Sequence, residues 1–320
     1  KGLGGTLATE IGFLHSLRCL SLHDNAIAGP IPTSISALFR LRALYLFHNL
    51  FTGSIPPSLP PSLHSINLAN NRLRGTIPSL HLHPRLPAAS LLLRRPSDLP
   101  VAMVPRLQAL NLSHNQLTGP IPPQLAELPY LRVMDLSHNL LDGSFPLAMA
   151  SSQIFFSLRA LDLSHNGLTG ALPDRIATEM ASLVSLDLSD NNFSGPIPSS
   201  LGGLSNLTVL DISHNSFHGN LPPSMASLSK LSSFNCSFNN LTGEVPKLAH
   251  SFDASSFEGN NAGLCGFSAN SPCPKTAATT GESSPLAETT IAADSKKKKK
   301  KKKTGFHVLA LVFIIIGIVI

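Results

Sequence analysis

Apolar residues recur along the chain in pairs whose two members are separated by one intervening residue. A clear copy is the segment Leu207-Thr-Val-Leu210-Asp-Ile212-Ser-His-Asn215. The alternation at Leu210 and Ile212 predicts a short strand that turns both side chains inward and the intervening polar residues outward. The asparagine that follows predicts the end of the strand, because a buried amide must bond to backbone groups of a turn.

Nine copies of this pattern align on the asparagine. Seven of the intervals between them measure 22 to 27 residues, and one measures 44. A period of about 20 to 29 residues is typical of a solenoid whose stacked units share one core and one parallel sheet. The predicted ladder asparagines are Asn25, Asn49, Asn71, Asn115, Asn139, Asn166, Asn191, Asn215 and Asn239.

The second half of each unit contains a glycine and an Ile-Pro pair, as in Leu117-Thr-Gly119-Pro-Ile121-Pro122. Glycine permits a tight backbone, and proline removes a hydrogen-bond donor from a ladder. The pattern therefore predicts a bend and a short extended stretch in this half, rather than a long helix.

The long interval lies between Asn71 and Asn115 and has room for one further unit. Leu91 fits a strand position of that unit, but Arg94 stands where the buried asparagine is expected. A guanidinium cannot replace a buried amide, because it has no acceptor. We therefore expect a distorted unit or a loop over residues 80–105, or an error in the derived sequence.

The charge of the chain is concentrated in its tail. The 320 residues include 24 Lys and Arg and 18 Asp and Glu, for a formal net charge of +6. Eight of the bases form one run at residues 296–303, so 16 bases face 18 acids elsewhere. The body therefore lacks the basic surface that nucleic-acid binding requires.

No catalytic or metal-binding constellation stands out in the sequence. Residues such as Asp135, Ser137 and His138 recur in unit after unit, so they belong to the repeat rather than to one site. The glycine-rich loop and the other kinase motifs do not occur. His81 and His83 have no cysteine or carboxylate cluster beside them. We expect no enzyme activity, no cofactor and no metal.

The two ends of the chain differ from the repeats. Lys1 falls at a ladder position with no cap before it, which leads us to expect a truncated start. Residues 276–303 are polar and end in the lysine run, which predicts a disordered stalk. Residues 304–320 are largely apolar but short of the ~30 Å of a bilayer core, so we expect a transmembrane segment that is cut off.

Two sets of residues carry a resemblance to known plant proteins. The glycine and Ile-Pro half-unit is the mark of the plant-specific leucine-rich repeat. The segment Gly263-Leu-Cys265-Gly266 through Pro272-Cys273-Pro274 resembles the closing segment of plant receptor-like kinase ectodomains. The ends look like the inflorescence meristem receptor-like kinases, in Lys1-Gly-Leu-Gly-Gly, Leu231-Ser-Ser-Phe-Asn235, Ser255-Ser-Phe257 and Pro272-Cys273-Pro274. The resemblance implies an α/β-type solenoid, a right-handed superhelix with a concave parallel sheet and a mostly irregular or 3-10 convex side. It also implies a cap in which Cys265 and Cys273 form a disulfide.

These observations divide the chain into four segments. Residues 1–250 are expected to form a solenoid of about ten units, with the degenerate one near 80–105, and residues 251–275 the cap. Residues 276–303 form the stalk and residues 304–320 the span.

The side of the membrane on which the repeats lie is a separate question. Lysines beside a span normally stay in the cytosol, whereas the repeats and the cysteine cap favour an outside location. We give the repeats and the cap more weight. A lipid-anchor signal is a further alternative, because small residues, a polar spacer and an apolar tail follow in that order.

The outward strand positions form columns across the predicted concave face. Later units carry Asp and Ser there, whereas Tyr45, Phe47 and His48 place aromatic side chains together. Exposed aromatic residues without a packing role are candidate binding anchors. Alternatively, Phe47 is covered by a neighbour such as Phe51, and the aspartates are ordinary residues of the repeat. The candidate ligand-binding residues are Tyr45, Phe47, His48, Asn67, Asp135, Asp162, Asp187 and Asp211.

Five Asn-x-Ser/Thr sequences are candidates for N-glycosylation if the chain is secreted. Two of them fall on concave strand positions, where a glycan would block the face. The five are Asn111, Asn192, Asn206, Asn235 and Asn240.

We therefore expect extracellular ligand recognition by a plant receptor-like kinase or receptor-like protein, single-pass in the plasma membrane with the repeats outside. Its partners are expected to be a peptide or wall-derived ligand and a co-receptor ectodomain, which the ligand bridges. The alternatives are a wall-associated inhibitor of microbial polygalacturonase, which normally lacks a span, and a truncated product without function.

Overall fold

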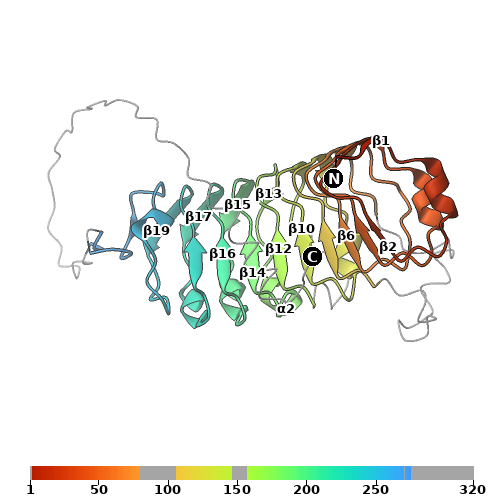
Figure 1. Ribbon diagram of the computed structural model, residues 1–320. Helices are drawn as coiled ribbons and strands as arrows, with labels where there is room; N and C mark the ends of the chain where they lie inside the picture. The colour runs from red at the N-terminus through yellow and green to blue at the C-terminus, as the bar shows by residue number, and fades with distance from the viewer. Residues whose placement is uncertain (1, 80–105, 146–156, 270, 275–320) are drawn as a thin grey trace, which may run out of the picture.

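The computed structural model describes residues 2–79, 106–145, 157–269 and 271–274. Short strands follow one another in chain order along an elongated solenoid, from the red N-terminal units to the blue C-terminal ones (Figure 1). Each unit makes two strands and, in most cases, a 3-10 turn. The predicted fold class, a solenoid with parallel sheets and mostly 3-10 turns on the other side, is confirmed.

One face of the solenoid is a nine-stranded parallel sheet, which we call the concave sheet. The apolar residue at the centre of each strand points inward and pairs in register with its equivalent, as Leu186 does with Leu210. The strands are β2 (Cys19–Ser21), β4 (Ala43–Tyr45), β6 (Ser65–Asn67), β8 (Ala109–Asn111), β10 (Val133–Asp135), β12 (Ala160–Asp162), β14 (Ser185–Asp187), β16 (Val209–Asp211) and β18 (Ser233–Asn235).

The glycine-containing half-units form a second row of parallel strands. The row consists of a six-stranded and a five-stranded sheet, with an isolated bridge between Ser144 and Thr169 where the two meet. The first comprises β1 (Gly4–Thr6), β3 (Ala26–Pro30), β5 (Leu50–Gly53), β7 (Arg72–Gly75), β9 (Gln116–Pro120) and β11 (Leu140–Asp142). The second comprises β13 (Thr169–Gly170), β15 (Asn192–Pro196), β17 (Ser216–Asn220), β19 (Asn240–Glu244) and β20 (Leu264–Cys265).

Tight helical turns return the chain from the second row to the concave sheet. Where the Ile-Pro pair is present, its proline holds an extended backbone just before the turn, as Pro198 does at φ −68° and ψ 140°. The turns are η1 (Thr9–Phe13), η2 (Thr33–Ala37), η5 (Pro123–Glu127), η6 (Ser199–Gly203), η7 (Pro223–Ser227) and η8 (Ala254–Ser256), with α2 (Ile176–Glu179) in one unit.

The core is one continuous column of aliphatic and phenylalanine side chains between the two rows of strands. Phe193 and Phe217 are fully buried, and their rings lie parallel with centroids 6.2 Å apart. Each unit packs against its two neighbours, so the stability of the array depends on contacts between adjacent units.

The ladder asparagines connect each unit to the next. The Nδ2 group of Asn139 donates to the carbonyl oxygens of Leu112, Leu136 and Ser137 at 3.0 to 3.1 Å. Its Oδ1 atom accepts from the Leu117 amide at 3.1 Å. These bonds satisfy a buried side chain and fix the turn at the end of each concave strand.

The sheet passes directly from β6 to β8, in register at Ile66 and Leu110. The ladder is also unbroken here, because the Leu73 amide donates to Asn115 Oδ1 at 3.0 Å although the two are 42 residues apart. The expected degenerate unit at residues 80–105 lies outside the described residues. Among the described residues β6 and β8 are direct neighbours, and the concave sheet has nine strands.

The repeats end in a cap that carries one further ladder asparagine. Asn260 accepts from the Leu241 amide at 3.1 Å and donates to the carbonyl oxygens of Cys236 and Phe257, both at 3.0 Å. Phe257 is buried against Phe234, and Cys265 is joined to Cys273 by a disulfide. Asn260 covers the open end of the ladder, a role that the sequence analysis missed.

Within the described residues, no helix has the length and apolar character needed to cross a membrane. The expected stalk and span, residues 276–303 and 304–320, lie outside these residues.

Candidate ligand-binding face

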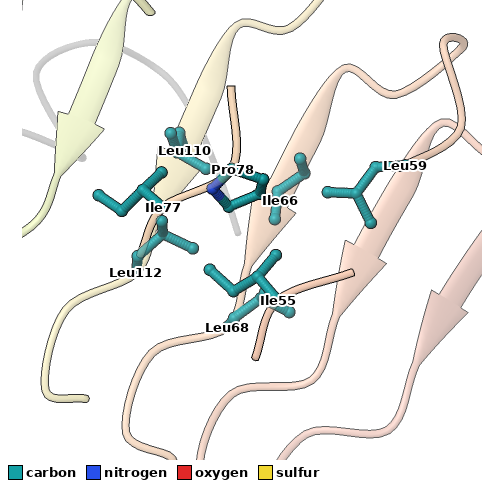
Figure 2. Close-up of a pocket in the computed structure, with 8 residues that line it drawn as sticks. All are labelled: Ile55, Leu59, Ile66, Leu68, Ile77, Pro78, Leu110 and Leu112. Carbon is teal, nitrogen blue, oxygen red and sulfur yellow. The ribbon is translucent and has the colours of Figure 1, made fainter. Parts of the chain in front are cut away.

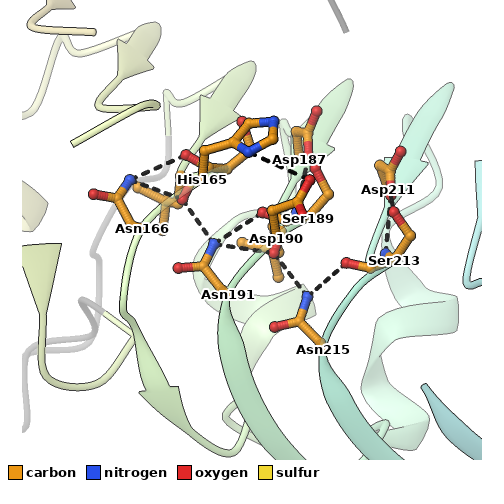
Figure 3. A network of polar contacts seen from close by, with 12 residues as sticks. His165, Asn166, Asp187, Ser189, Asp190, Asn191, Asp211, Ser213 and Asn215 are labelled. Carbon is orange, nitrogen blue, oxygen red and sulfur yellow. Dashed lines mark hydrogen bonds and ion pairs between the residues drawn. The ribbon is translucent and has the colours of Figure 1, made fainter. Parts of the chain in front are cut away.

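The centre of the concave sheet carries a column of carboxylates that are held by serines. On four successive strands, the Oδ1 atom of the aspartate accepts from the amide and the hydroxyl of the serine two residues later. For Asp162 and Ser164 these distances are 2.9 and 2.7 Å. Figure 3 shows the same arrangement for Asp187 with Ser189 and for Asp211 with Ser213. We call Asp135, Asp162, Asp187 and Asp211 the aspartate column.

Two members of the aspartate column are buried and two are half-buried. Asp135 and Asp162 are only 5% and 6% exposed, whereas Asp187 and Asp211 are half-buried. Asn67, at the equivalent position of β6, is also buried. Adjacent aspartates lie in register on neighbouring strands, about 4.8 Å apart. Asp135, Asp162 and Asn67 therefore offer little accessible surface, and the assignment of the column as ligand-binding stays a prediction.

Burial and mutual repulsion change the ionisation of the column. Burial raises the pKa of the Asp135 carboxyl. Burial, followed by repulsion from Asp187 and Asp135, raises the pKa of Asp162 well above its ordinary value. Burial and the neighbouring Asp211 raise the pKa of Asp187 to about 7. Asp135, Asp162 and Asp187 therefore retain protons at pH values where an isolated carboxyl has lost them.

The aromatic candidates lie on the second concave strand and the turn after it. Tyr45 and Phe47 are half-buried, and His48 is exposed. The Phe47 ring stacks on His23 of the neighbouring unit, with centroids 4.4 Å apart, and meets His48 edge-on at 5.4 Å. Phe47 is covered on one face by His23, and not by Phe51, which points into the core. Tyr45 has no hydrogen-bond partner for its hydroxyl among the described residues, so that group is free to bind.

A carboxylate clamped between two imidazoles borders this aromatic patch. Asp24 accepts from His23 Nδ1 at 2.7 Å and from His48 Nδ1 at 2.9 Å. These two bonds lower the pKa of Asp24. They also fix both imidazole rings, and with them the Phe47 ring. Phe47, His48, His23 and Asp24 thus form one pre-organised group. We call this group, together with Tyr45 on β4, the aromatic patch.

The residue before each ladder asparagine has a left-handed backbone, and these residues form a second column. Three of its imidazoles stack. The ring centroid of His138 lies 4.0 Å from that of His114 and 4.0 Å from that of His165. Burial, followed by the neighbouring imidazoles, lowers the pKa of His138 to about 4. We call this set the left-handed column: Asp24, His48, Asn70, His114, His138, His165, Asp190, His214 and Phe238.

The five glycosylation candidates differ in accessibility. Asn192 and Asn240 are exposed at the starts of β15 and β19, away from the concave sheet. Asn111, Asn206 and Asn235 are half-buried, and Asn235 donates to Asp211 Oδ2 at 3.2 Å. Glycans at Asn192 and Asn240 would leave the concave face open.

A small pocket opens into the core beside β6 and β8 (Figure 2). Its lining is entirely apolar and includes Leu59, Ile77 and Leu110. A ligand site normally adds a few polar groups that fix orientation. We interpret the pocket as incomplete packing and not as a binding site. In the part of the chain that the structure describes, no cluster of His, Cys, Asp or Glu is arranged to hold a metal ion.

A row of arginines that was not predicted from the sequence borders the concave sheet. Arg18, Arg42, Arg132 and Arg159 each stand one residue before a concave strand, and all four are exposed. Backbone bonds connect this position from unit to unit, as from the Arg159 amide to the Arg132 carbonyl at 2.8 Å. We call these four residues the arginine border. Their regular spacing in the repeat was the signal that could have revealed them.

Comparison with known protein families identifies the repeats. Two models described as leucine-rich repeat match, one at residues 156–217 and the other at residues 16–38, 40–61, 62–82 and 106–128. Only these repeats are matched, and no catalytic domain is among the matches. No curated protein matches the sequence.

Solved structures place the fold among plant receptors and one protein of another kind. A TDR receptor is 28% identical, with a TM-score of 0.56, over 77% of this chain and 43% of its own. The Arabidopsis receptor kinase HAESA, in complex with the peptide hormone IDA and the co-receptor SERK1, is 28% identical with a TM-score of 0.51, over 82% of this chain and 52% of its own. A plant ice-binding protein is also 28% identical with a TM-score of 0.54, over 86% of this chain and 81% of its own.

The chain thus spans about half the length of these receptor structures or less. The ice-binding protein shows that the fold alone does not determine a role. What the repeats, the two strand rows and these likenesses establish together is that the chain is a plant-type leucine-rich-repeat solenoid resembling the ectodomains of leucine-rich-repeat receptor kinases.

Proposed function

We propose that the chain is the extracellular recognition part of a plant membrane receptor, a receptor-like kinase or receptor-like protein. It binds a peptide on the concave sheet and presents the complex to a co-receptor ectodomain. The likeness to HAESA, which is seen with a peptide hormone and a co-receptor, supports this class of partners. The two ends of the chain further suggest the inflorescence meristem group.

The observation that carries the proposal is the aromatic patch on the first strands of the concave sheet. On β10, β12, β14 and β16, outward positions are filled by aspartate and serine pairs that bond to each other. The patch instead offers the Tyr45 hydroxyl and one face of the Phe47 ring, whose other face is held by His23 before a ligand arrives. Rigid aromatic groups of this kind contribute much of the binding energy in known interfaces.

Replacing Tyr45 and Phe47 together with alanine is expected to abolish peptide retention while the fold persists. The loss of the Phe47–His23 stack lowers the free energy of unfolding by about 1 kcal/mol, since aromatic pairs contribute about that much. Peptides from plant extracellular fluid retained on the full chain would be identified by mass spectrometry, and unfolding would be followed by circular dichroism.

A matched control removes two aromatic side chains from another surface. Phe39 and Tyr130 are 66% and 50% exposed and lie in the turns before β4 and β10. The Phe39→Ala, Tyr130→Ala variant should retain the same peptides as the wild type. Equal retention by the Tyr45→Ala, Phe47→Ala variant would contradict the proposal.

The membrane location is tested separately by extraction of the expressed full chain. We expect release from membranes by detergent and not by salt. Release by salt alone would favour the wall-associated inhibitor over the receptor.

A further inference from the structure

The arginine border has a charge that nothing in the described part of the chain neutralises. None of its four guanidinium groups forms an ion pair or a side-chain hydrogen bond with a described residue. Arg40 and Arg106 each lie two residues before the border position of their unit, which is the residue that precedes the concave strand. Both are exposed, and neither forms an ion pair or a side-chain hydrogen bond with a described residue. Six arginines therefore gather along one edge of the concave sheet, although the solenoid body as a whole is close to neutral.

The nearest carboxylates on these strands do not form ion pairs with the arginines. Asp135 and Asp162 lie on the strands that Arg132 and Arg159 precede, but both carboxylates are buried and bonded to serines. The strand position between them is occupied by Val133 and Ala160, which have no charge. At β10 and β12, the described residues therefore present positive charge at the edge of the sheet and no exposed carboxylate beside it.

The border is also limited in extent. The equivalent positions of the two intervening units hold His64 and Gln108, and the last three units hold Val184, Thr208 and Ser232. Arg18 and Arg42 precede the two strands that carry the aromatic patch, and Arg132 and Arg159 precede β10 and β12. Neighbouring strands are about 4.8 Å apart, so five steps place Arg18 and Arg159 roughly 24 Å from each other.

We propose that the ligand of the concave sheet is an acidic peptide in an extended conformation, with carboxylates at both ends that pair with the arginine border. An extended chain advances about 3.3 Å per residue, so about seven or eight residues span the border. Guanidinium groups bind carboxylates through paired hydrogen bonds, which favours this chemistry over a neutral ligand. This inference rests on the proposed function and specifies its ligand.

The test uses the full chain and a fluorescent octapeptide with two aspartates at each end and four neutral residues between them. The comparison peptide has asparagine in place of every aspartate. We expect the acidic peptide to bind, the neutral one to bind at least about tenfold more weakly, and binding to weaken as salt is added. Equal binding of the two peptides would overturn the inference.

Two double variants and a matched control locate the binding. Arg18→Gln with Arg42→Gln, and Arg132→Gln with Arg159→Gln, should each weaken binding of the acidic peptide about tenfold without unfolding the chain. Arg72→Gln with Arg74→Gln removes the same charge from exposed residues of β7 in the second row, and its affinity should change less than about twofold. An equal loss in this control would show that net charge and not the border is responsible, and would overturn the inference.

The outcomes separate this inference from the proposed function. If a neutral peptide binds and is lost on replacing Tyr45 and Phe47, recognition of peptides stands and the acidic ligand does not. If neither peptide binds but an oligomer of galacturonate does, in a way that depends on the border, the ligand is an anionic polysaccharide and the peptide assignment is wrong.

Discussion

Replacing Asp162 and Asp187 with asparagine is expected to stabilise the protein at about pH 8, by on the order of 2–4 kcal/mol. The two carboxyls lie in register on neighbouring strands, and ionising them brings like charges together in a buried place. Asparagine keeps the accepted hydrogen bonds, as Asn111 shows by accepting from the Ser113 amide and hydroxyl at 2.9 and 2.7 Å. Thermal unfolding between about pH 5 and pH 8.5 measures the effect.

The pH dependence of the wild type has a direction that follows from the pKa shifts. A carboxyl with a raised pKa binds more protons in the folded state, so its contribution to stability falls as pH rises through the folded pKa. For Asp187 this loss builds up from the ordinary carboxyl pKa of about 4 and is nearly complete at the folded pKa of about 7, so only its last part falls above about pH 6.5. The lowered pKa values of His114 and His138 act in the opposite direction, but only below about pH 6.5.

We therefore expect the melting temperature of the wild type to fall between about pH 6.5 and pH 8, and that of the Asp162→Asn, Asp187→Asn variant to change little there. The reverse substitution is the control. Asn111 pairs in register with Asp135, so Asn111→Asp adds a fifth carboxylate to the column. It should destabilise the protein at pH 8 far more than at pH 5. A wild-type melting temperature that rises over this range would contradict the account of the column.

Replacing Asn115 with alanine is expected to lower the free energy of unfolding by about 3–5 kcal/mol, or about 10 °C in melting temperature. Asn115 is buried and donates to the carbonyl oxygens of Leu68, Leu112 and Ser113 at 3.0 to 3.2 Å. It also accepts from the Leu73 amide, 42 residues earlier in the chain, between units that adjoin in the sheet. Removing the Asn115 side chain leaves several buried backbone groups without partners at this junction.

Asn25→Ala is the matched control for this prediction. Asn25 makes the same kinds of bond, to Leu3, Leu22 and His23, but it is only half-buried in the first concave unit. Water can replace part of what its side chain provides, so we expect a smaller loss, about 1–2 kcal/mol. If the two variants melt at the same temperature, Asn115 does not have the bridging role assigned to it.

The repeat could be predicted from the sequence because the same pattern recurs in every unit. The positions of Leu210, Ile212 and Asn215 hold the same kinds of residue in every copy, so nine weak patterns together predict a solenoid strongly. Asn260 was missed because the cap keeps the asparagine but loses the apolar alternation before it, with Phe257 as the main core contact. The hydrogen bonds of Asn260 are evident only in the three-dimensional structure.

The environment of the outward residues was not predictable, since it depends on the neighbouring strands. Asp162 reads as an exposed polar residue, yet it is buried because Asp135, Asp187 and Ser164 surround it. The position of Phe47 depends in the same way on His23, 24 residues earlier in the chain. Sequence periodicity gives the direction of a side chain and not what lies against it.

The left-handed column also restricts which substitutions the protein can accept. At nine places the backbone requires φ between 51° and 56°, a region that β-branched residues rarely enter and that asparagine, aspartate and histidine tolerate best. Histidine therefore recurs here because of backbone geometry, and the stacked imidazoles follow from it. Over evolutionary time, the edge of the binding face can vary among only a few residue types, so new ligand specificity has to arise at the strand positions beside it.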